Sequence, residues 1–469
     1  MTVTPLGTSQ AEPPPSKTPR RAFQAVAWIV ILVVVLLAML SGPGASPAGD
    51  GRVTPIEDAT LEMESRLVIA QEAVAPGSGS QALDQINQSP DVDRRIRLAS
   101  IAAAIGGAEA GSDWVTAVRA ELADRGVDPT ARQAAEIDGL DRLFAGDASA
   151  TVTADVEERL GWFGQIAVDA ASADRADRLK PVVEQSVLMA TVMVTSLVVL
   201  GLIGVAGLVL LVIYVVRAAQ GLIPRAMAAA RPWDGVYAET FAVWLILFQV
   251  LLLLSDVLDG GLPTDLQMAP AVVAFFLSLG ALAWPVVRGI PWEDVRRDIG
   301  WTRGRGLRRE IGCGIMGYAM AIPIVAVGLV ITLVLILLFA PDAGAGSAAH
   351  PIVGEVAGGG WLIRAQVLVL ASIAAPIVEE TMFRGVLYRQ VRTSAGMLPR
   401  GASVAVAVTA TSLVFAMIHP QGVLAVPVLG AMAAAFALAR EWRGSLVAAV
   451  VMHGMSNGIV MVMLMAIFS

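Results

Sequence analysis

Long apolar runs separated by short polar segments dominate the pattern along the chain. The first is the uncharged run from Ala22 to Leu40. At 1.5 Å per residue, a helix of this length measures about 28 Å, enough to cross a bilayer. Eight more runs follow, near residues 187–216, 241–258, 268–287, 311–340, 362–383, 402–419, 423–439 and 445–467. The pattern predicts an all-α fold, a polytopic membrane helix bundle of about nine transmembrane helices.

The start of the chain is predicted to be a disordered cytoplasmic tail and then a membrane helix. Residues 1–21 hold five prolines and almost no large apolar side chains, which is typical of disorder. Residues 22–40 are the first predicted transmembrane helix. A signal peptide is the alternative, although its apolar core is usually about 7–15 residues long; whether the helix is cleaved stays open. In both cases the chain that follows is exported.

Residues 43–180 differ in composition from the rest of the chain. They contain 24 acidic and 13 basic residues, which gives a net charge of −11. Strong helix formers recur there at helical spacing, as in residues 61–70 and 118–125. We expect an inserted, acidic, helical extracytoplasmic domain. It could bind an extracytoplasmic partner or gate substrates, and a passive spacer is the alternative.

Charge in the connecting segments predicts the orientation. Arginines follow the runs that end near residues 216, 287 and 383, and seven of them lie between Arg288 and Arg309. By the positive-inside rule these connections face the cytoplasm, together with the tail. We therefore expect a multi-pass protein of the cell's inner (plasma) membrane, with residues 43–180 outside the cytoplasm.

The overall composition excludes several classes of protein. Only 16% of the residues are charged, whereas soluble domains have about 25%, so the chain is no soluble globule. The net charge of −7 offers no basic surplus for nucleic acid. The single cysteine, Cys313, excludes an internal disulfide framework and a thiolate zinc site.

A carboxylate pair breaks the apolar pattern of the run near residues 362–383. Ionisable side chains in a bilayer cost about 2.5–3.5 kcal/mol each on insertion scales and mark functional sites by default. Glu380 and Arg384 are four apart and can pair on a helix. Glu379 points about 100° away from Glu380 and has no such local cation, which suits a general base. The alternative is a plain cytoplasmic helix boundary.

Two of the three histidines also lie in apolar runs. His419 follows Phe415 by four residues and precedes a proline. His453 and Asn457 are also four apart, so they share one helix face. Structural roles are the alternative for both, since a histidine and an asparagine could equally bond two membrane helices together. His350 lies in a Gly/Ala-rich segment and is expected to be a bystander.

Taken together, Glu379-Glu380-x-x-x-Arg384, Phe415-x-x-x-His419 and His453-x-x-x-Asn457 resemble the motifs of the CPBP family, the CAAX-processing and bacteriocin-processing (Abi) intramembrane glutamic proteases. The resemblance covers roughly residues 370–460, and it is looser over the segments 298–301 and 307–310. It does not extend to residues 1–180.

The resemblance implies that residues 187–469 are an eight-helix membrane protease domain. Glu379 and His419 would activate a water molecule, and His453 and Asn457 would donate to the oxyanion. Glu380, Arg384 and Phe415 would support them, and the substrate would be a membrane protein or peptide. The family is read as metal-independent, so no cofactor is expected. Zinc on Glu379, His419 and His453 is the rival, although a His-Glu-x-x-His signature is absent.

Chain lengths predict an irregular backbone at this site. If straight helices start at Trp361, Arg400 and Gly444, then Glu379, His419 and His453 lie at different depths. Some segment must be tilted, broken or partly re-entrant, with Pro376, Pro420 and Pro427 as candidate positions. We expect a cavity at intermediate depth that opens towards the cytoplasmic half.

Two other functions compete with proteolysis. A non-proteolytic membrane scaffold, such as an immunity or sorting factor of the same fold, would keep the motifs for packing. A transporter would also place polar residues at mid-membrane, although no inverted repeats are visible.

Overall fold

The computed structural model describes residues 21–41, 55–87, 91–223, 227, 235–340 and 352–468. Within these residues every regular element is a helix and none is a strand, which confirms the predicted all-α class. Of the predicted tail, residues 1–21, only Arg21 is described, and His350 also lies outside the described residues.

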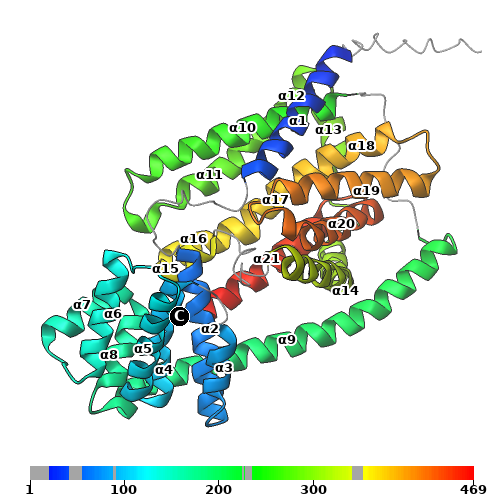
Figure 1. Ribbon diagram of the computed structural model, residues 1–469. Helices are drawn as coiled ribbons and strands as arrows, with labels where there is room; N and C mark the ends of the chain where they lie inside the picture. The colour runs from blue at the N-terminus through cyan, green and yellow to red at the C-terminus, as the bar shows by residue number, and fades with distance from the viewer. Residues whose placement is uncertain are drawn as a thin grey trace, which may run out of the picture.

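Nine spans among the described residues are long and apolar enough to cross a membrane, as predicted (Figure 1). They are Phe23–Leu40, Arg175–Ala219, Val236–Asp259, Thr264–Val287, Leu307–Phe339, Trp361–Ser394, Arg400–Met417, Val423–Arg443 and Val447–Ile467. The chain is a multi-pass membrane protein with a polytopic helical bundle.

A separate group of short helices follows α1 (Arg21–Ser41). Its members are α2 (Pro55–Val74), α3 (Gly79–Ile86), α4 (Val92–Gly106), α5 (Ala108–Asp124), α6 (Ala131–Phe144), α7 (Ala150–Leu160) and α8 (Trp162–Ala171). The helix α4 packs against α5 and α8, and its Leu98 and Ile101 are fully buried in a core that also contains Leu140 and Ile166. The acidic segment therefore has its own hydrophobic core, and we call α2–α8 the helical domain.

One long helix, α9 (Arg175–Ala219), joins the helical domain to the bundle. Its 45 residues correspond to about 68 Å, more than twice the thickness of a bilayer core of about 30 Å. Near its start Leu179 packs in the core of the helical domain. The predicted boundary at residue 180 thus falls inside a continuous helix.

The remaining helices form the bundle. In chain order they are α10 (Val236–Asp259), η1 (Thr264–Leu266), α11 (Ala269–Ser278), η2 (Leu279–Leu282), α12 (Ala283–Val287), α13 (Trp292–Ile299), α14 (Leu307–Phe339), α15 (Ile352–Gly358), α16 (Trp361–Val369), η4 (Leu370–Ala374), α17 (Ala375–Glu380), η5 (Thr381–Leu387), α18 (Tyr388–Ser394), α19 (Arg400–Met417), η6 (Val423–Ala425), α20 (Val426–Arg443) and α21 (Val447–Ile467). The helix α14 contacts α9, α20 and α21, and α19 contacts α20.

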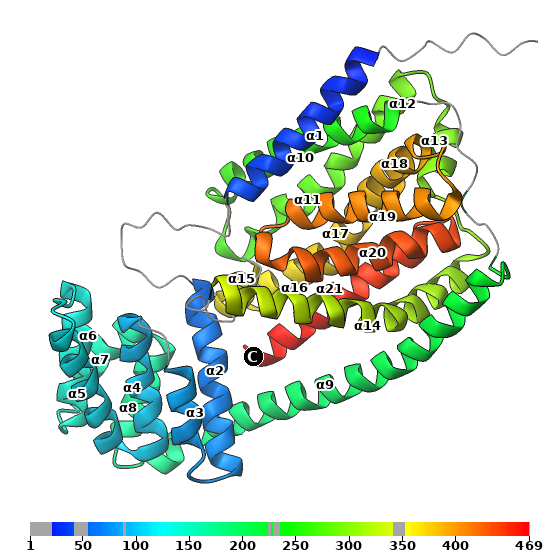
Figure 2. The ribbon, with the colours of Figure 1, turned by 45° about the vertical axis from the view of Figure 1, so that its right-hand side comes forward.

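The two ends of the bundle differ in what they carry (Figures 1 and 2). At one end α1 begins beside the arginine-rich segment, where the Arg288 guanidinium lies 5.7 Å from the Phe23 ring centroid; α13 and α18 lie at this end as well. At the other end α2 packs against α15, and Ala59, Val356 and Met461 of α2, α15 and α21 belong to one buried cluster. The helical domain and the arginine-rich segment therefore lie at opposite ends.

Candidate active site

The residues singled out by the sequence meet in the middle of the bundle. Glu379 and Glu380 lie on α17, His419 in the turn after α19, and His453 on α21. Glu379 Oε2 is 4.0 Å from His419 Nε2 and 3.9 Å from His453 Nε2. Glu379 and His419 can share a water molecule only if their side chains lie less than about 10 Å apart, and the observed distance meets this condition.

The sequence predicts different depths for Glu379 and His419, but the helix that carries Glu379 is longer than its apolar run, and this removes the difference. The span continues past residue 383 to Ser394. At an α-helical rise from the connection at 395–399, Glu379 lies about 22 Å back along its helix, and His419, two residues past the end of α19, lies about 28 Å forward. The two residues therefore reach similar depths without a re-entrant segment.

The backbone around the carboxylates is nevertheless irregular. Two π-helical segments, η4 and η5, flank α17 within the continuous span. Pro376 lies in the first turn of α17, and Pro427 in the first turn of α20. π-helical turns occur frequently at functional sites. The expected interruption is thus a pair of wide turns in a helix that remains unbroken.

The Glu380 carboxylate accepts hydrogen bonds from two side chains at once. Its Oε1 accepts hydrogen bonds from Arg384 Nη1 and from His453 Nδ1, both at 2.9 Å. Arg384 Nη2 also donates to the carbonyl oxygen of Ala433 at 3.2 Å. The expected Glu380–Arg384 pair is therefore present, with side chains only 0% and 1% exposed. Because a buried ion pair needs further hydrogen bonds, the bonds to His453 and Ala433 matter for its stability.

The hydrogen bonds of the two histidines fix which ring nitrogen faces Glu379. His419 Nδ1 lies 2.6 Å from the Phe415 carbonyl oxygen, which can only accept, so Nδ1 carries the proton. His453 Nδ1 donates to the Glu380 carboxylate in the same way. Both rings therefore turn Nε2 towards Glu379.

Aromatic rings hold these groups in place. Phe415 lies 4.1 Å from the His419 ring and 4.5 Å from the Arg384 guanidinium. Phe436 stacks on His453 at 5.1 Å. The sequence motifs contain Phe415 but not Phe436, whose position in an apolar run carries no signal of this contact.

The carboxylates of Glu379 and Glu380 differ in their exposure to solvent. The side chains of Glu379 and His419 are each 17% exposed, whereas that of His453 is 3% exposed and that of Glu380 is fully buried. Glu379 Oε2 has no hydrogen-bond partner among the described residues. Part of the Glu379 and His419 side chains is thus accessible, although Glu379 Oε2 itself is buried between the two rings.

Asn457 is anchored to the first π-helical segment. Its Nδ2 donates to the carbonyl oxygen of Ala371 at 2.9 Å. An amide nitrogen carries two protons, so one N–H remains for another acceptor. The bond fixes the amide of Asn457 one helical turn beyond His453 on α21.

The donor geometry gives the zinc alternative no support. Within the described ranges, no group of three or more His, Cys, Asp or Glu side chains is arranged to hold a metal ion.

Buried polar contacts also tie the helices around the site to the arginine-rich segment. Asp298 accepts from Tyr237 Oη at 3.0 Å and from Arg389 Nη2 at 3.1 Å. Glu310 accepts from Arg443 Nε and Nη2 at 2.9 and 2.6 Å. Asp298 and Glu310 lie in the two segments of looser family resemblance, but nothing in the sequence indicates their partners.

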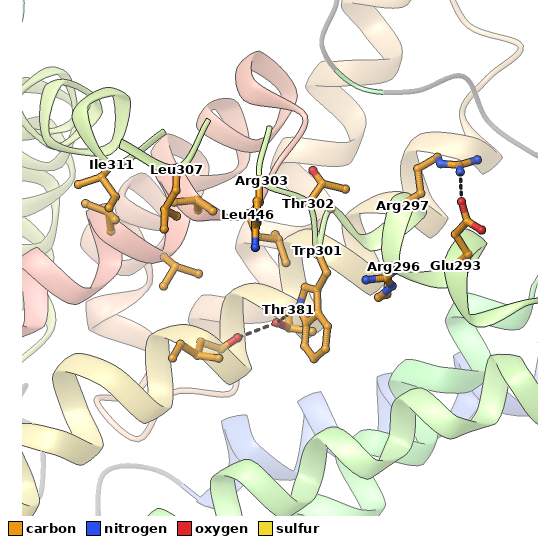
Figure 3. Close-up of a pocket in the computed structure, with 15 residues that line it drawn as sticks. Glu293, Arg296, Arg297, Trp301, Thr302, Arg303, Leu307, Ile311, Thr381 and Leu446 are labelled. Atoms are coloured by element: carbon orange, nitrogen blue, oxygen red, sulfur yellow. Dashed lines mark hydrogen bonds and ion pairs between the residues drawn. The ribbon is translucent and has the colours of Figure 1, made fainter. Parts of the chain in front are cut away.

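A pocket of about 670 Å³ lies on another face of α17 (Figure 3). Ile377 and Thr381 line it from the helix that carries Glu379. Neither Glu379 nor either histidine lines it, so it is not the predicted catalytic cavity.

Comparison with known proteins agrees with the motifs. Residues 361–459 match the family model of the type II CAAX prenyl endopeptidase Rce1-like proteins, about a fifth of the chain. No curated protein and no solved structure matches the chain significantly. The matched segment contains Glu379, both histidines of the site and Asn457. Residues 361–459 thus form an Rce1-like domain, and this match supports a membrane protease of the CPBP type.

Proposed function

We propose that the protein hydrolyses a peptide bond of a membrane-associated substrate by direct attack of water. The observation that carries the proposal is the position of Glu379 Oε2, 4.0 and 3.9 Å from two imidazole nitrogens. These separations are too long for direct hydrogen bonds and suit groups that share a small ligand. No covalent nucleophile is needed.

Glu379 is the proposed base, and His419 orients the water. With its proton on Nδ1, neutral His419 offers the Nε2 lone pair, so it accepts one water proton. The Glu379 carboxylate accepts the other. General-base catalysis of this kind contributes about 10²–10⁴-fold to a rate.

His453 and Asn457 are the proposed oxyanion donors. His453 can donate from Nε2 only as an imidazolium, because Nδ1 already donates to Glu380. In that form the ring would lie between the two carboxylates, with Nε2 3.9 Å from Glu379 and Nδ1 2.9 Å from Glu380. Buried charges are tolerated when they are paired and hydrogen-bonded. The second N–H of Asn457 completes the donor set.

The proton balance closes without another group. Glu379 takes a proton as the water oxygen bonds to the carbonyl carbon, and the carbonyl oxygen becomes the oxyanion. When the oxyanion collapses, the C–N bond breaks and Glu379 returns the proton to the amine. The products are a peptide that ends in a carboxylic acid, which releases the second water proton to solvent when it ionises, and a peptide that begins with an amine.

The test compares membrane peptides in cells that express the wild type, Glu379→Gln, His419→Ala or the control Glu355→Gln. Glu355 is an exposed glutamate on α15. We expect new peptide termini with the wild type and the control. Their formation should fall by about 10²–10⁴-fold in the two site variants, which lack the base or its partner.

Two results would contradict the proposal. Unchanged cleavage by a folded Glu379→Gln protein would show that Glu379 is not the base. A wild type that binds its partners but produces no new termini would favour the non-proteolytic scaffold.

We further propose that the helical domain is extracytoplasmic and that the bundle lies in the plasma membrane. The arginine-rich segment lies at the end of the bundle opposite the helical domain, which the positive-inside rule places in the cytoplasm. An exposed domain at the outer face would contact an extracytoplasmic partner or the substrate.

Cysteine labelling tests this orientation. In a Cys313→Ser background, a membrane-impermeant maleimide should label Ser80→Cys of the helical domain in intact cells. It should label Arg305→Cys only after permeabilisation. Both positions are exposed. The reverse labelling pattern would overturn the orientation.

A further inference from the structure

The pocket beside the active-site helix has two chemically different parts. One side of it is aliphatic, with Ile311 from α14, Ile377 from α17 and Val450 and Val451 from α21. Its rim is formed by α13 and the connection to α14, and it contains three arginines and one glutamate. Aliphatic side chains beside a basic rim match an amphiphile with an anionic head.

Two of the rim arginines make no ion pair with a carboxylate of the described residues. Arg297 donates to Glu293 at 2.8 Å and points away from the other lining residues (Figure 3). Arg296 and Arg303 make no side-chain hydrogen bond or ion pair with any other described residue. In Figure 3 the Arg303 side chain points towards the middle of the lining residues. The rim therefore presents two uncompensated positive charges.

Beside the rim lies an aromatic pair typical of a membrane interface, of which Trp301, but not Trp292, lines the pocket. Trp292 and Trp301 are 42% and 36% exposed, and their rings meet edge to face at 5.9 Å. Tryptophan is enriched at the level of the lipid headgroups. The pocket thus lies where a lipid headgroup would be.

The pocket is separate from the catalytic carboxylate. Ile377 and Thr381 are four apart and share one face of the helix, whereas Glu379 lies about 160–200° around from them. A molecule in the pocket cannot place a peptide bond against Glu379. Its occupant is therefore not the substrate bond.

We infer that this pocket binds one anionic phospholipid, with its phosphate at Arg296 and Arg303 and an acyl chain against Ile311, Ile377, Val450 and Val451. Basic pockets between membrane helices on the cytoplasmic side recognise such headgroups. The inference is independent of the proposed catalysis, since binding does not require hydrolysis.

The occupant also touches the active-site helix. Trp301 Nε1 donates to Thr381 Oγ1 at 2.9 Å, one residue beyond Glu380. Both residues line the pocket. Lipid binding would therefore act on the second π-helical segment through this hydrogen bond.

The experiment titrates phosphatidylglycerol or phosphatidylcholine with the same acyl chains into the full-length protein in detergent and measures retained lipid by native mass spectrometry. We expect tighter binding of phosphatidylglycerol. Two arginine contacts correspond to a factor of about 30, so Arg296→Gln/Arg303→Gln should weaken phosphatidylglycerol binding by about 30-fold. Phosphatidylcholine binding should not change.

Two further variants separate the head from the chain. Arg308→Gln/Arg309→Gln removes two exposed arginines of the same region that do not line the pocket, and it should bind like the wild type. Ile311→Trp fills the aliphatic wall from a residue that is 38% exposed. It should lose phosphatidylglycerol while keeping both rim arginines.

Several results would overturn the inference. Equal retention of the two lipids would exclude a headgroup site, and equal losses in the two double-arginine variants would show diffuse attraction only. Competition by inorganic phosphate alone, with Ile311→Trp unaffected, would indicate a free-anion site. Displacement by a peptide with a free carboxylate, dependent on Arg296 and Arg303, would indicate a peptide site instead.

Discussion

Glu379 and Glu380 are neighbours in the chain but have opposite surroundings. A rotation of about 100° places Glu380 in a dry contact with Arg384 and His453. Glu379 instead faces two Nε2 atoms with part of its side chain accessible. The same functional group therefore serves the structure at one position and is available for chemistry at the next.

Removing Arg384 should destabilise the bundle strongly. Arg384→Met leaves the buried Glu380 without its cation, and such losses cost about 3–5 kcal/mol. The control Arg297→Gln breaks an exposed pair with Glu293 and should cost about 0–1 kcal/mol. Thermal unfolding in detergent measures both.

The double variant Glu380→Gln/Arg384→Met checks the cause. It should be less destabilised than the sum of its single variants, because residues in one network do not act additively. An Arg384→Met protein as stable as Arg297→Gln would mean that the pair contributes nothing.

Helical spacing predicts local pairs at the site but not the distant ones. The spacing of four joins Glu380 to Arg384 and Phe415 to His419, and both contacts exist. The stacking of Phe436 on His453 depends on how α20 packs against α21. A single sequence contains no such signal.

At the scale of the elements, hydropathy predicted the number of spans but ended one of them too early. The run stops near residue 383 because Arg384, Tyr388 and Arg389 follow. The helix continues because distant partners satisfy these groups: Asp298 accepts from Arg389, and Glu441 accepts from Tyr388 at 3.1 Å. Buried polar groups need such partners, which the local sequence cannot supply.

The contact between α9 and α14 should depend on one glycine. A Cβ atom at Gly207 would overlap the carbonyl oxygen of Ala319, whereas one at Gly201 of the same helix would meet open space. We expect Gly207→Ala to force the helices apart and cost about 1–3 kcal/mol. Gly201→Ala should be neutral or slightly stabilising, since alanine is the better helix former.

Thermal unfolding compares these two variants, and hydrogen exchange of α9 locates the change. Equal unfolding temperatures and equal exchange would show that the bundle does not need the close approach at Gly207.

At the scale of the molecule, composition predicted a helical domain that ends at residue 180, a position that lies inside α9. The change from acidic to apolar sequence near residue 180 marks a change in surroundings along α9, not a break in the helix. Composition responds to the solvent around each side chain, whereas a helix continues wherever its backbone bonds do.

The helical domain should undock from the bundle when the contact between α2 and α15 is disrupted. Ala59 is 3% exposed in the cluster with Val356 and Met461, so Ala59→Glu buries a charge there. Ala73→Glu makes the same change at an exposed position of α2. We expect faster hydrogen exchange at the start of α2 and in α15 only for Ala59→Glu.

The core of the helical domain, around Leu98, should stay protected in both variants. Equal exchange of α2 in Ala59→Glu and Ala73→Glu would contradict a docking role for this contact.

The contacts of the arginine-rich segment limit how this protease can be recombined with relatives. All proposed catalytic side chains lie within residues 361–459, which suggests that this segment could be exchanged as a unit in chimeric proteins. Yet Asp298 bonds Arg389, Trp301 bonds Thr381 and Glu310 bonds Arg443. A graft that stops at residue 361 would cut all three bonds, so a working exchange must begin upstream of Asp298.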